Sequence, residues 1–119
     1  FVAGNPFRSM IICIYWVGMF NQHNNAIVAT DAPLTKAECK RLAIAAHDGM
    51  ARAIMPSHTP HDGDLIFSLS TKLRADEPPA NLMTLGNAAA HCVARSIARA
   101  VYHATPAKND LLTTWSESR

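Results

Sequence analysis

Pro56-Ser-His-Thr-Pro-His-Asp-Gly-Asp64 runs directly into Leu65-Ile-Phe-Ser-Leu-Ser-Thr71. The first nine residues follow a long helical pattern, and the next seven alternate large apolar residues with others, as a strand does. This connection carries two prolines, two histidines and two aspartates, more polar groups than a simple turn needs. The stretch therefore fixes a helix-to-strand step in the fold and is also the candidate site-bearing loop.

Two carboxylates flank Gly63 at the start of this strand, those of Asp62 and Asp64. Side chains two residues apart in an extended chain share a face, so we expect both on similar sides. Two carboxylates held that close would repel each other, and such a pair can transfer protons or orient a nucleophile. The alternative is a plain turn, because Asp-Gly is a common turn dipeptide and Asp binds backbone amides. Both interpretations stay open on the residues alone.

A helix is predicted upstream of this loop. Thr35-Lys-Ala-Glu38 has the form of a capping box, and Pro56 is expected to end the helix. Between them, apolar residues recur at steps of three and four, as on the buried stripe of a helix packed on a sheet. The stripe comprises Leu42, Ala45, Ala46, Gly49, Met50, Ala53 and Ile54. Residues 26–30 before it predict a short strand that ends in a turn at Asp31.

A second amphipathic helix is predicted after the exposed connection 72–79. Its stripe comprises Leu82, Leu85, Ala89, Val93, Ile97, Ala100 and Val101. Its small residues Ala88, Ala89 and Ala90 would allow close approach to a neighbouring element. Strand, helix, strand, helix is typical of the α/β class. Two strands cannot stand alone, so upstream sequence or another chain must complete the sheet.

The most apolar run is residues 9–20, which is little more than half the length of a membrane-spanning helix. Its Ile, Val, Tyr and Trp content favours a buried strand, with a signal or anchor segment as the alternative. The chain has 119 residues, is 49% hydrophobic and carries a net charge of +2 without a basic stripe. One packed domain is therefore expected, with no nucleic acid and no membrane as partner. Three widely spaced cysteines suit buried thiols in a reducing compartment, so a cytoplasmic location is expected.

Several separate blocks of the sequence resemble the C-terminal part of the DmpA-type aminopeptidases and their nylon-oligomer hydrolase relatives. These blocks are residues 29–34, 46–54, the loop and strand from His58 onward, Leu85-Gly86 and residues 94–100. They occur in the family's order and together cover about residues 22 to 103. The resemblance defines a DmpA-like small-subunit domain at 22–105, a divergent apolar segment at 1–21 and a loose C-terminal tail at 106–119.

The resemblance implies an N-terminal-nucleophile hydrolase of peptide or amide bonds. Such enzymes cut their own precursor before a Ser or Thr, and the new terminal residue attacks the substrate. The implied fold is a sandwich of helices around sheets, assembled from a small and a large subunit and often oligomeric. The family's acid pair matches Asp62 and Asp64 here, and no cofactor or metal is implied. We therefore expect a homo-oligomer, or a large subunit that this chain does not contain.

The sequence departs from the family where the nucleophile belongs. Counting back from the Ala29-Thr30-Asp31 block places that position at His23, and no Ser or Thr lies between Ser9 and Thr30. Histidine has no hydroxyl and cannot make the acyl shift of self-cleavage. The chain is therefore expected to be a truncated or diverged copy that is inactive by itself. The alternative is a non-catalytic oligomerisation or assembly module on the same half-fold.

Other candidates in the sequence have weaker support. His58, His61, Asp62 and Asp64 could ligate a metal, but their spacing fits no standard zinc pattern. His58 is expected to hold the loop, and His47 to belong to a polar cap or exposed pair near the helix end. Cys39 has no histidine beside it, which favours a packed thiol over a nucleophile.

Overall fold

The computed structural model describes residues 2–4, 10–17, 24–73, 75–76, 81–110 and 113–119. Within them the elements are β1 (Val2–Gly4), β2 (Met10–Val17), β3 (Asn24–Thr30), α1 (Lys36–Ala53), β4 (Leu65–Ser70) and α2 (Leu82–His103). From β3 onward the order is strand, helix, strand, helix, as the sequence predicts. His23 lies outside the described residues.

The four strands form one sheet in the order β1-β2-β3-β4. β2 pairs antiparallel with both of its neighbours, whereas β3 and β4 are parallel. A parallel pair needs a crossover connection, and α1 with its flanking loops provides it. The apolar run of residues 9–20 contains β2, which confirms the strand expected there. Sequence upstream of residue 22 thus adds two strands to the two predicted after it.

The start of α1 is the predicted capping box. The Thr35 hydroxyl accepts a hydrogen bond from the Glu38 N–H at 3.3 Å, and the Glu38 carboxylate accepts from the Thr35 N–H at 2.7 Å. These bonds satisfy two backbone donors that the first helical turn leaves open. They also hold the pKa of Glu38 below its ordinary value, because the Thr35 backbone and side chain both stabilise the carboxylate.

Thr35→Ala is expected to lower the free energy of unfolding by about 1 kcal/mol at neutral pH, because the helix loses its N-cap. Because folding lowers the pKa of Glu38, the ionised carboxylate stabilises the fold at pH values above its ordinary pKa of 4.5. This stabilisation is lost as the pH falls from 4.5 through the lowered pKa. The difference between variant and wild type should therefore shrink in acid. Urea denaturation at neutral and acidic pH measures it. Thr114→Ala is the matched control, since the N–H and hydroxyl of Thr114 also donate to a glutamate three residues on, Glu117, but outside any helix. Equal losses in both variants would contradict the prediction.

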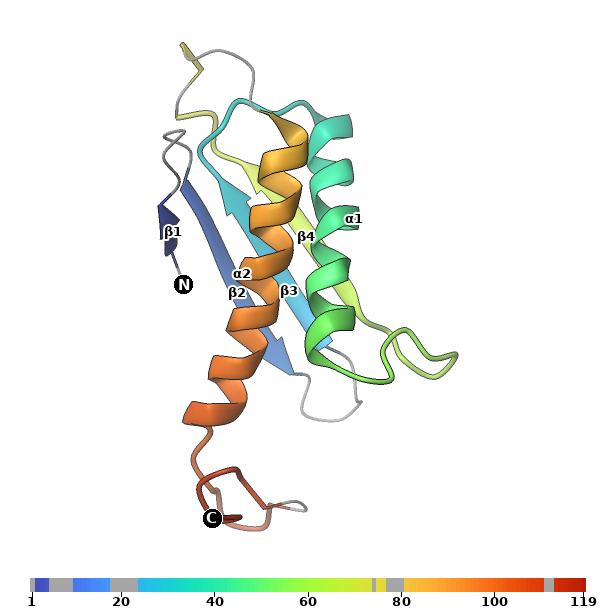
Figure 1. Ribbon diagram of the computed structural model, residues 1–119, viewed down its shortest axis with the longest axis vertical. Helices are drawn as coiled ribbons and strands as arrows, with labels where there is room; N and C mark the ends of the chain where they lie inside the picture. Colours follow the sequence, from blue (N-terminus) through green and yellow to red (C-terminus); the bar gives the residue numbers. More distant parts are fainter. Residues whose placement is uncertain (1, 5–9, 18–23, 74, 77–80, 111–112) are drawn as a thin grey trace.

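Both helices lie side by side on one face of the sheet (Figure 1). The core between the layers is made by alternate residues of the strands and by most of each predicted helix stripe. Ala53, predicted on the stripe of α1, is exposed at the end of that helix. Its buried members include Ile11, Cys13, Ala26, Val28, Leu42, Ala46, Met50, Ile66, Leu85, Ala89, Val93 and Ile97. The last turn of α2 departs from its predicted stripe, because Val101 is 55% exposed.

The helices approach each other closely where their facing residues are small. A Cβ atom on Gly49 would lie 2.0 Å from the backbone oxygen of Ala90, closer than any real contact. A Cβ atom on Gly86 would lie 3.0 Å from the Cβ of Ala45, which is tight but meets only a side chain. The alanine-rich segment of α2 therefore serves the close packing that the sequence predicts.

The more apolar face of β4 points away from the helices. Leu65, Phe67 and Leu69 are 45%, 54% and 43% exposed on this face. Ser68 and Ser70 lie on the opposite face, where their hydroxyls donate hydrogen bonds to the backbone oxygens of Cys39 and Ala32. The hydroxyl of Ser70 thereby satisfies a backbone carbonyl in the segment before α1. The sheet is thus covered by helices on one side and presents an apolar β4 surface on the other.

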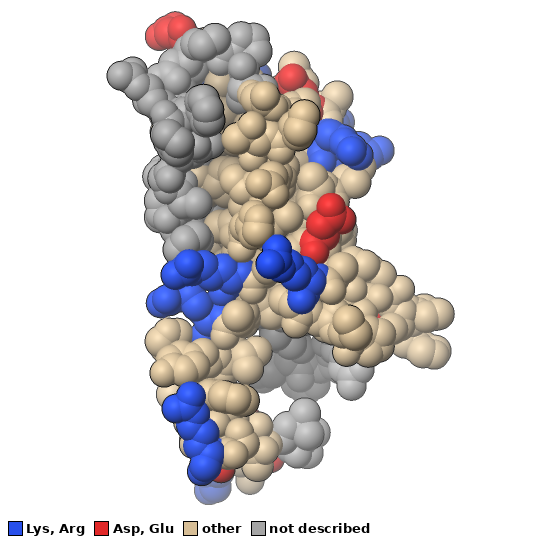
Figure 2. Space-filling view, viewed as in Figure 1, with Lys and Arg blue, Asp and Glu red and all other residues tan. Residues whose placement is uncertain are grey.

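Helix length and the distribution of basic residues bear on membrane and nucleic-acid binding. None of the helices among the described residues is long and apolar enough to cross a bilayer. On the face shown in Figure 2, Lys and Arg lie in separate groups over the helices and the tail. In that tail, the Arg119 guanidinium lies 5.4 Å from the ring centre of Trp115 and 5.9 Å from that of Tyr102. These contacts bring the end of the chain back to α2.

Candidate functional site

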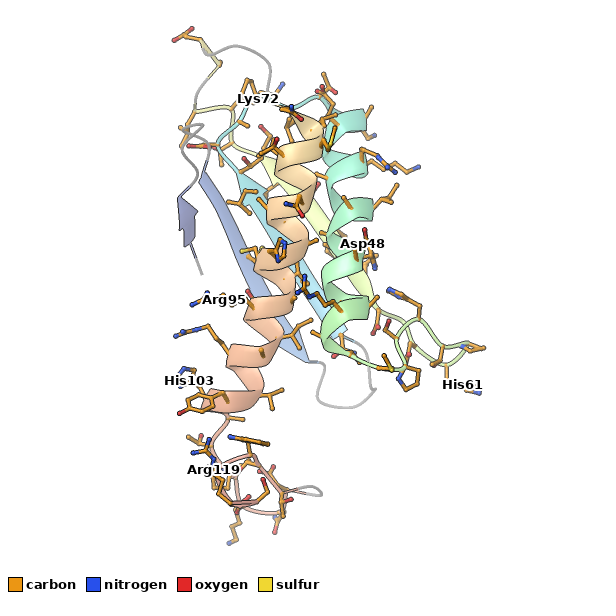
Figure 3. The ribbon with its side chains drawn as sticks, in the orientation of Figure 1. Asp48, His61, Lys72, Arg95, His103 and Arg119 are labelled. Carbon is orange, nitrogen blue, oxygen red and sulfur yellow. The ribbon has the colours of Figure 1, made fainter. Side chains whose placement is uncertain are left out.

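The loop between α1 and β4 folds on itself through Asp62. Its carboxylate accepts a hydrogen bond from the Thr59 N–H at 3.0 Å, and its own N–H donates to the Thr59 oxygen at 3.0 Å. This reciprocal pair closes a turn that places His61 at the outer tip of the loop (Figure 3). The turn interpretation of the Asp-Gly segment therefore describes Asp62 in this structure.

Asp64 joins the loop to the sheet. Its Oδ1 accepts hydrogen bonds from the backbone N–H of Asn24 at 2.8 Å and from the Asn24 side-chain amide at 3.2 Å. The parallel register sets this contact, because Asn25 lies opposite Leu65 and both strands begin at the same edge of the sheet. The carboxylate is therefore held in a fixed orientation by a residue forty positions away in the sequence.

The second oxygen of Asp64 has no partner. Oδ2 is buried and makes no hydrogen bond. A buried carboxylate oxygen without a donor is costly, and such groups often mark sites where a further group binds or reacts. The partner of Oδ1 is the residue that directly follows position 23. Asp64 thus combines a fixed orientation, an available acceptor and sequence proximity to the predicted nucleophile position.

The hydrogen bonds described above attach the two acids to different parts of the chain. Asp62 contacts the backbone of its own loop, whereas Asp64 contacts β3. Their joint role as catalytic residues stays a prediction, as does that of His23.

A pair of histidines is associated with this acid, and the expected roles were loop support or metal ligation for His58 and a polar cap or exposed pair for His47. The ring centres of His47 and His58 are 5.0 Å apart. Burial lowers the pKa of His47, and the neighbouring His58 lowers it further, against smaller upward effects of Asp64 and Asp48. In the sequence, this contact is indicated only by the positions of His47 and His58 on either side of the end of α1. The surroundings of His47 therefore favour its neutral form.

Comparison of the sequence with known proteins identifies the family. The sequence model of peptidase family S58 matches residues 21–111, most of the chain. The chain belongs to peptidase family S58. The matched region of this S58 chain contains β3, α1, β4 and α2, and therefore both Asn24 and Asp64. β1 and β2 lie before it.

Curated relatives of the S58 chain are longer proteins. It is 42% identical over 104 residues to an uncharacterized aminopeptidase of Mycobacterium bovis, a match that covers 76% of this chain and 30% of the relative. It is 46% identical over 86 residues to an uncharacterized aminopeptidase of Mycobacterium leprae, covering 63% of this chain and 24% of the relative. The chain thus spans about a third or less of the relatives it matches.

The S58 chain also contains possible metal ligands and three thiols. Within the described ranges, no group of three or more His, Cys, Asp or Glu side chains could hold a metal ion. Cys39 is partly buried against the core. Cys13 and Cys92 are buried free thiols in contact, and the hydrogen bond from Cys13 lowers the pKa of Cys92 to about 7. The same contact raises the pKa of Cys13.

Proposed function

We propose that this S58 chain is the small-subunit part of an amide-bond hydrolase of the N-terminal-nucleophile type, whose ancestral reaction is that of an aminopeptidase or amidase. The observation that carries the proposal is the state of Asp64. One carboxylate oxygen is fixed by the N–H of residue 24, while the other is buried and unpartnered. A hydroxyl or amine on the preceding residue would find an oriented acceptor there.

The chemistry follows from that placement. In a relative with Ser or Thr at position 23, the hydroxyl oxygen attacks the carbonyl carbon of the preceding residue and breaks the C–N bond. Breaking this bond frees the α-amine of the nucleophile residue, and water then hydrolyses the resulting ester to restore the hydroxyl and leave a carboxylate on the preceding residue. The carboxylate of Asp64 orients the attacking hydroxyl, and Asp62 keeps the loop closed beneath it. Because His23 has no hydroxyl, the present chain neither cuts itself nor forms an acyl-enzyme.

A chimaera tests the proposal. Residues 21–111 would replace the matching part of the Mycobacterium bovis relative, with either His23 or Thr at that position. With His23 we expect one uncut polypeptide and no release of p-nitroaniline from an aminoacyl anilide. With His23→Thr we expect cleavage before residue 23, seen by intact mass, and release of p-nitroaniline. The unaltered relative, measured in parallel, establishes whether the anilide is a substrate.

Two results would contradict the proposal. Cleavage and turnover in the His23 chimaera would show that no hydroxyl is needed at this position. Release of p-nitroaniline by the purified chain itself, lost on Asp62→Ala, would overturn its assignment as an inactive copy.

A second candidate function is a non-catalytic assembly module, favoured by the exposed leucine and phenylalanine side chains of β4. Apolar sheet faces of this kind are normally covered by a second layer. A large subunit or a second copy of the chain would cover it, and a cytoplasmic location suits the free thiols. Light scattering separates the two candidates, because a stable monomer at high concentration contradicts the assembly module.

A further inference from the structure

Two imidazole rings meet where the loop leaves α1. His47 is half-buried near the end of the helix, and His58 lies in the loop with its ring tilted by 50° against it. His58 has a φ angle of 57°, in the left-handed region. A residue with a Cβ atom stays in this region only where its surroundings hold it there. The ring contact therefore ties the first part of the loop to the helix.

The last part of the loop acts on the same histidine through its charge. The negative charge of Asp64 acts on His47, since it favours the protonated ring. Burial and the nearby His58 disfavour that form and outweigh it. His47 thus stands between the two ends of the loop, with one imidazole and one carboxylate acting on it in opposite directions.

Further charged and titratable groups lie on α1 and on the facing side of α2. Asp48 follows His47 in the helix and also favours its protonated form. On the side of α1 that faces α2, His91 lies with Asp48 and Arg52 along the outer groove between the helices. The ionisable groups that affect the pKa of His47 are therefore Asp48 of α1, His58 of the loop and Asp64 just before β4.

We propose that His47 and His58 form a pH-sensitive positioning pair for Asp64. In the neutral form, the pair keeps both ends of the loop together and holds Asp64 against Asn24. Protonation of His47 places a positive charge against the His58 ring 5.0 Å away in a partly buried position, and this arrangement opens. The inference rests on the proposed function in one respect, because it treats Asp64 as the carboxylate of the site.

The direction of the pH dependence follows from the folded state. The pKa of His47 lies below its ordinary value of 6.5 in the folded chain. Folding therefore favours the neutral ring, and its stabilising effect is complete above that ordinary value. The effect is lost as the pH falls from there through the lowered pKa of the folded state. The Asp64–Asn24 contact should weaken over the same interval.

The backbone amide of Asn24 reports on this contact directly, because its N–H donates to Asp64. In the ¹⁵N-labelled chain we expect its chemical shift to change between about pH 8 and pH 5, with a midpoint below 6.5, and its exchange protection to fall about tenfold or more beyond the ordinary pH dependence of exchange. His47→Gln and His58→Asn should each remove this transition. Asparagine suits the second position because it tolerates the left-handed backbone.

His61→Asn is the matched control, since His61 lies at the tip of the same loop, away from the pair. It should leave the Asn24 transition unchanged. The proposal is overturned if Asn24 shows no transition in the wild type, or if the transition persists with the same midpoint in both His47→Gln and His58→Asn. A chain without hydrolase activity would leave this result standing, because the measurement does not depend on turnover.

A second measurement does not depend on the folding of either histidine variant. In Asp64→Asn, the pKa of His47 measured from its ring Cε1–H signal should fall, because the favourable charge is lost. An unchanged pKa of His47 would show that the carboxylate and the pair are not coupled, and the positioning role would be refuted.

Discussion

Gly49→Ala is expected to destabilise the chain by about 2 kcal/mol, although alanine favours helices more than glycine does. The new methyl group would lie 2.0 Å from the backbone oxygen of Ala90, so the two helices must move apart. Overpacking of this kind costs about 3 kcal/mol at the upper end of its range, and helix propensity offsets about 1 kcal/mol of that. Urea denaturation of wild type and variant measures the difference.

Gly86→Ala provides the matched control for this prediction. It adds the same methyl group to the other helix of the same interface, but the nearest atom is the Cβ of Ala45 at 3.0 Å. A side-chain contact of this length is relieved by a small shift, and the gain in helix propensity offsets its cost. We expect stability within about 0.5 kcal/mol of the wild type. Equal destabilisation by both substitutions would show that backbone contact at Gly49 is not the limiting feature.

Asp64→Asn is expected to have the largest effect on catalysis. In the His23→Thr chimaera it should lower kcat/KM by about a hundredfold or more, the usual contribution of a group that orients or accepts a proton. The amide can still accept from the Asn24 N–H through its oxygen, so folding should be retained. The NH₂ group of the asparagine, however, is a hydrogen-bond donor, whereas the Oδ2 atom of Asp64 that it replaces is an acceptor without a partner. Hydrolysis of the aminoacyl anilide, with stability measured on the same samples, separates the two effects.

Asp62→Asn serves as the comparison for Asp64→Asn. The carboxylate of Asp62 closes a turn by accepting from the Thr59 N–H, and an amide oxygen can do the same. Its kcat/KM should therefore fall by about tenfold or less. If both variants lost activity equally, the two acids would act as a pair, which is the arrangement that their spacing in the sequence suggests.

Local features of the fold could be predicted because each depends on neighbouring residues. The Thr35–Glu38 capping box lies within one helical turn, and the apolar stripes of both helices follow from a fixed spacing. The strand at residues 10–17 follows from its β-branched and aromatic content. The family could be predicted for a different reason, since it depended on several blocks in a known order.

The geometry of the site could not be predicted from the sequence, because it depends on contacts between distant residues. Asp64 meets Asn24 only because β3 and β4 pair in a parallel register. The alternation of β4 indicates two unlike faces, but only the position of α1 decides that the serine face lies inside. The contact between His47 and His58 likewise requires a loop that turns back on its helix.

The antiparallel pairing of β2 with β3 has a consequence for any backbone break between them. β2 is paired along the whole of β3, from Val17 opposite Asn24 to Ile11 opposite Thr30. Two fragments separated before position 23 would share this ladder and the core residues beneath it, so they would stay together as one nicked particle. They would part on a denaturing gel but travel as a single species through a sizing column, and maturation of such a chain would release a new terminus without releasing a subunit.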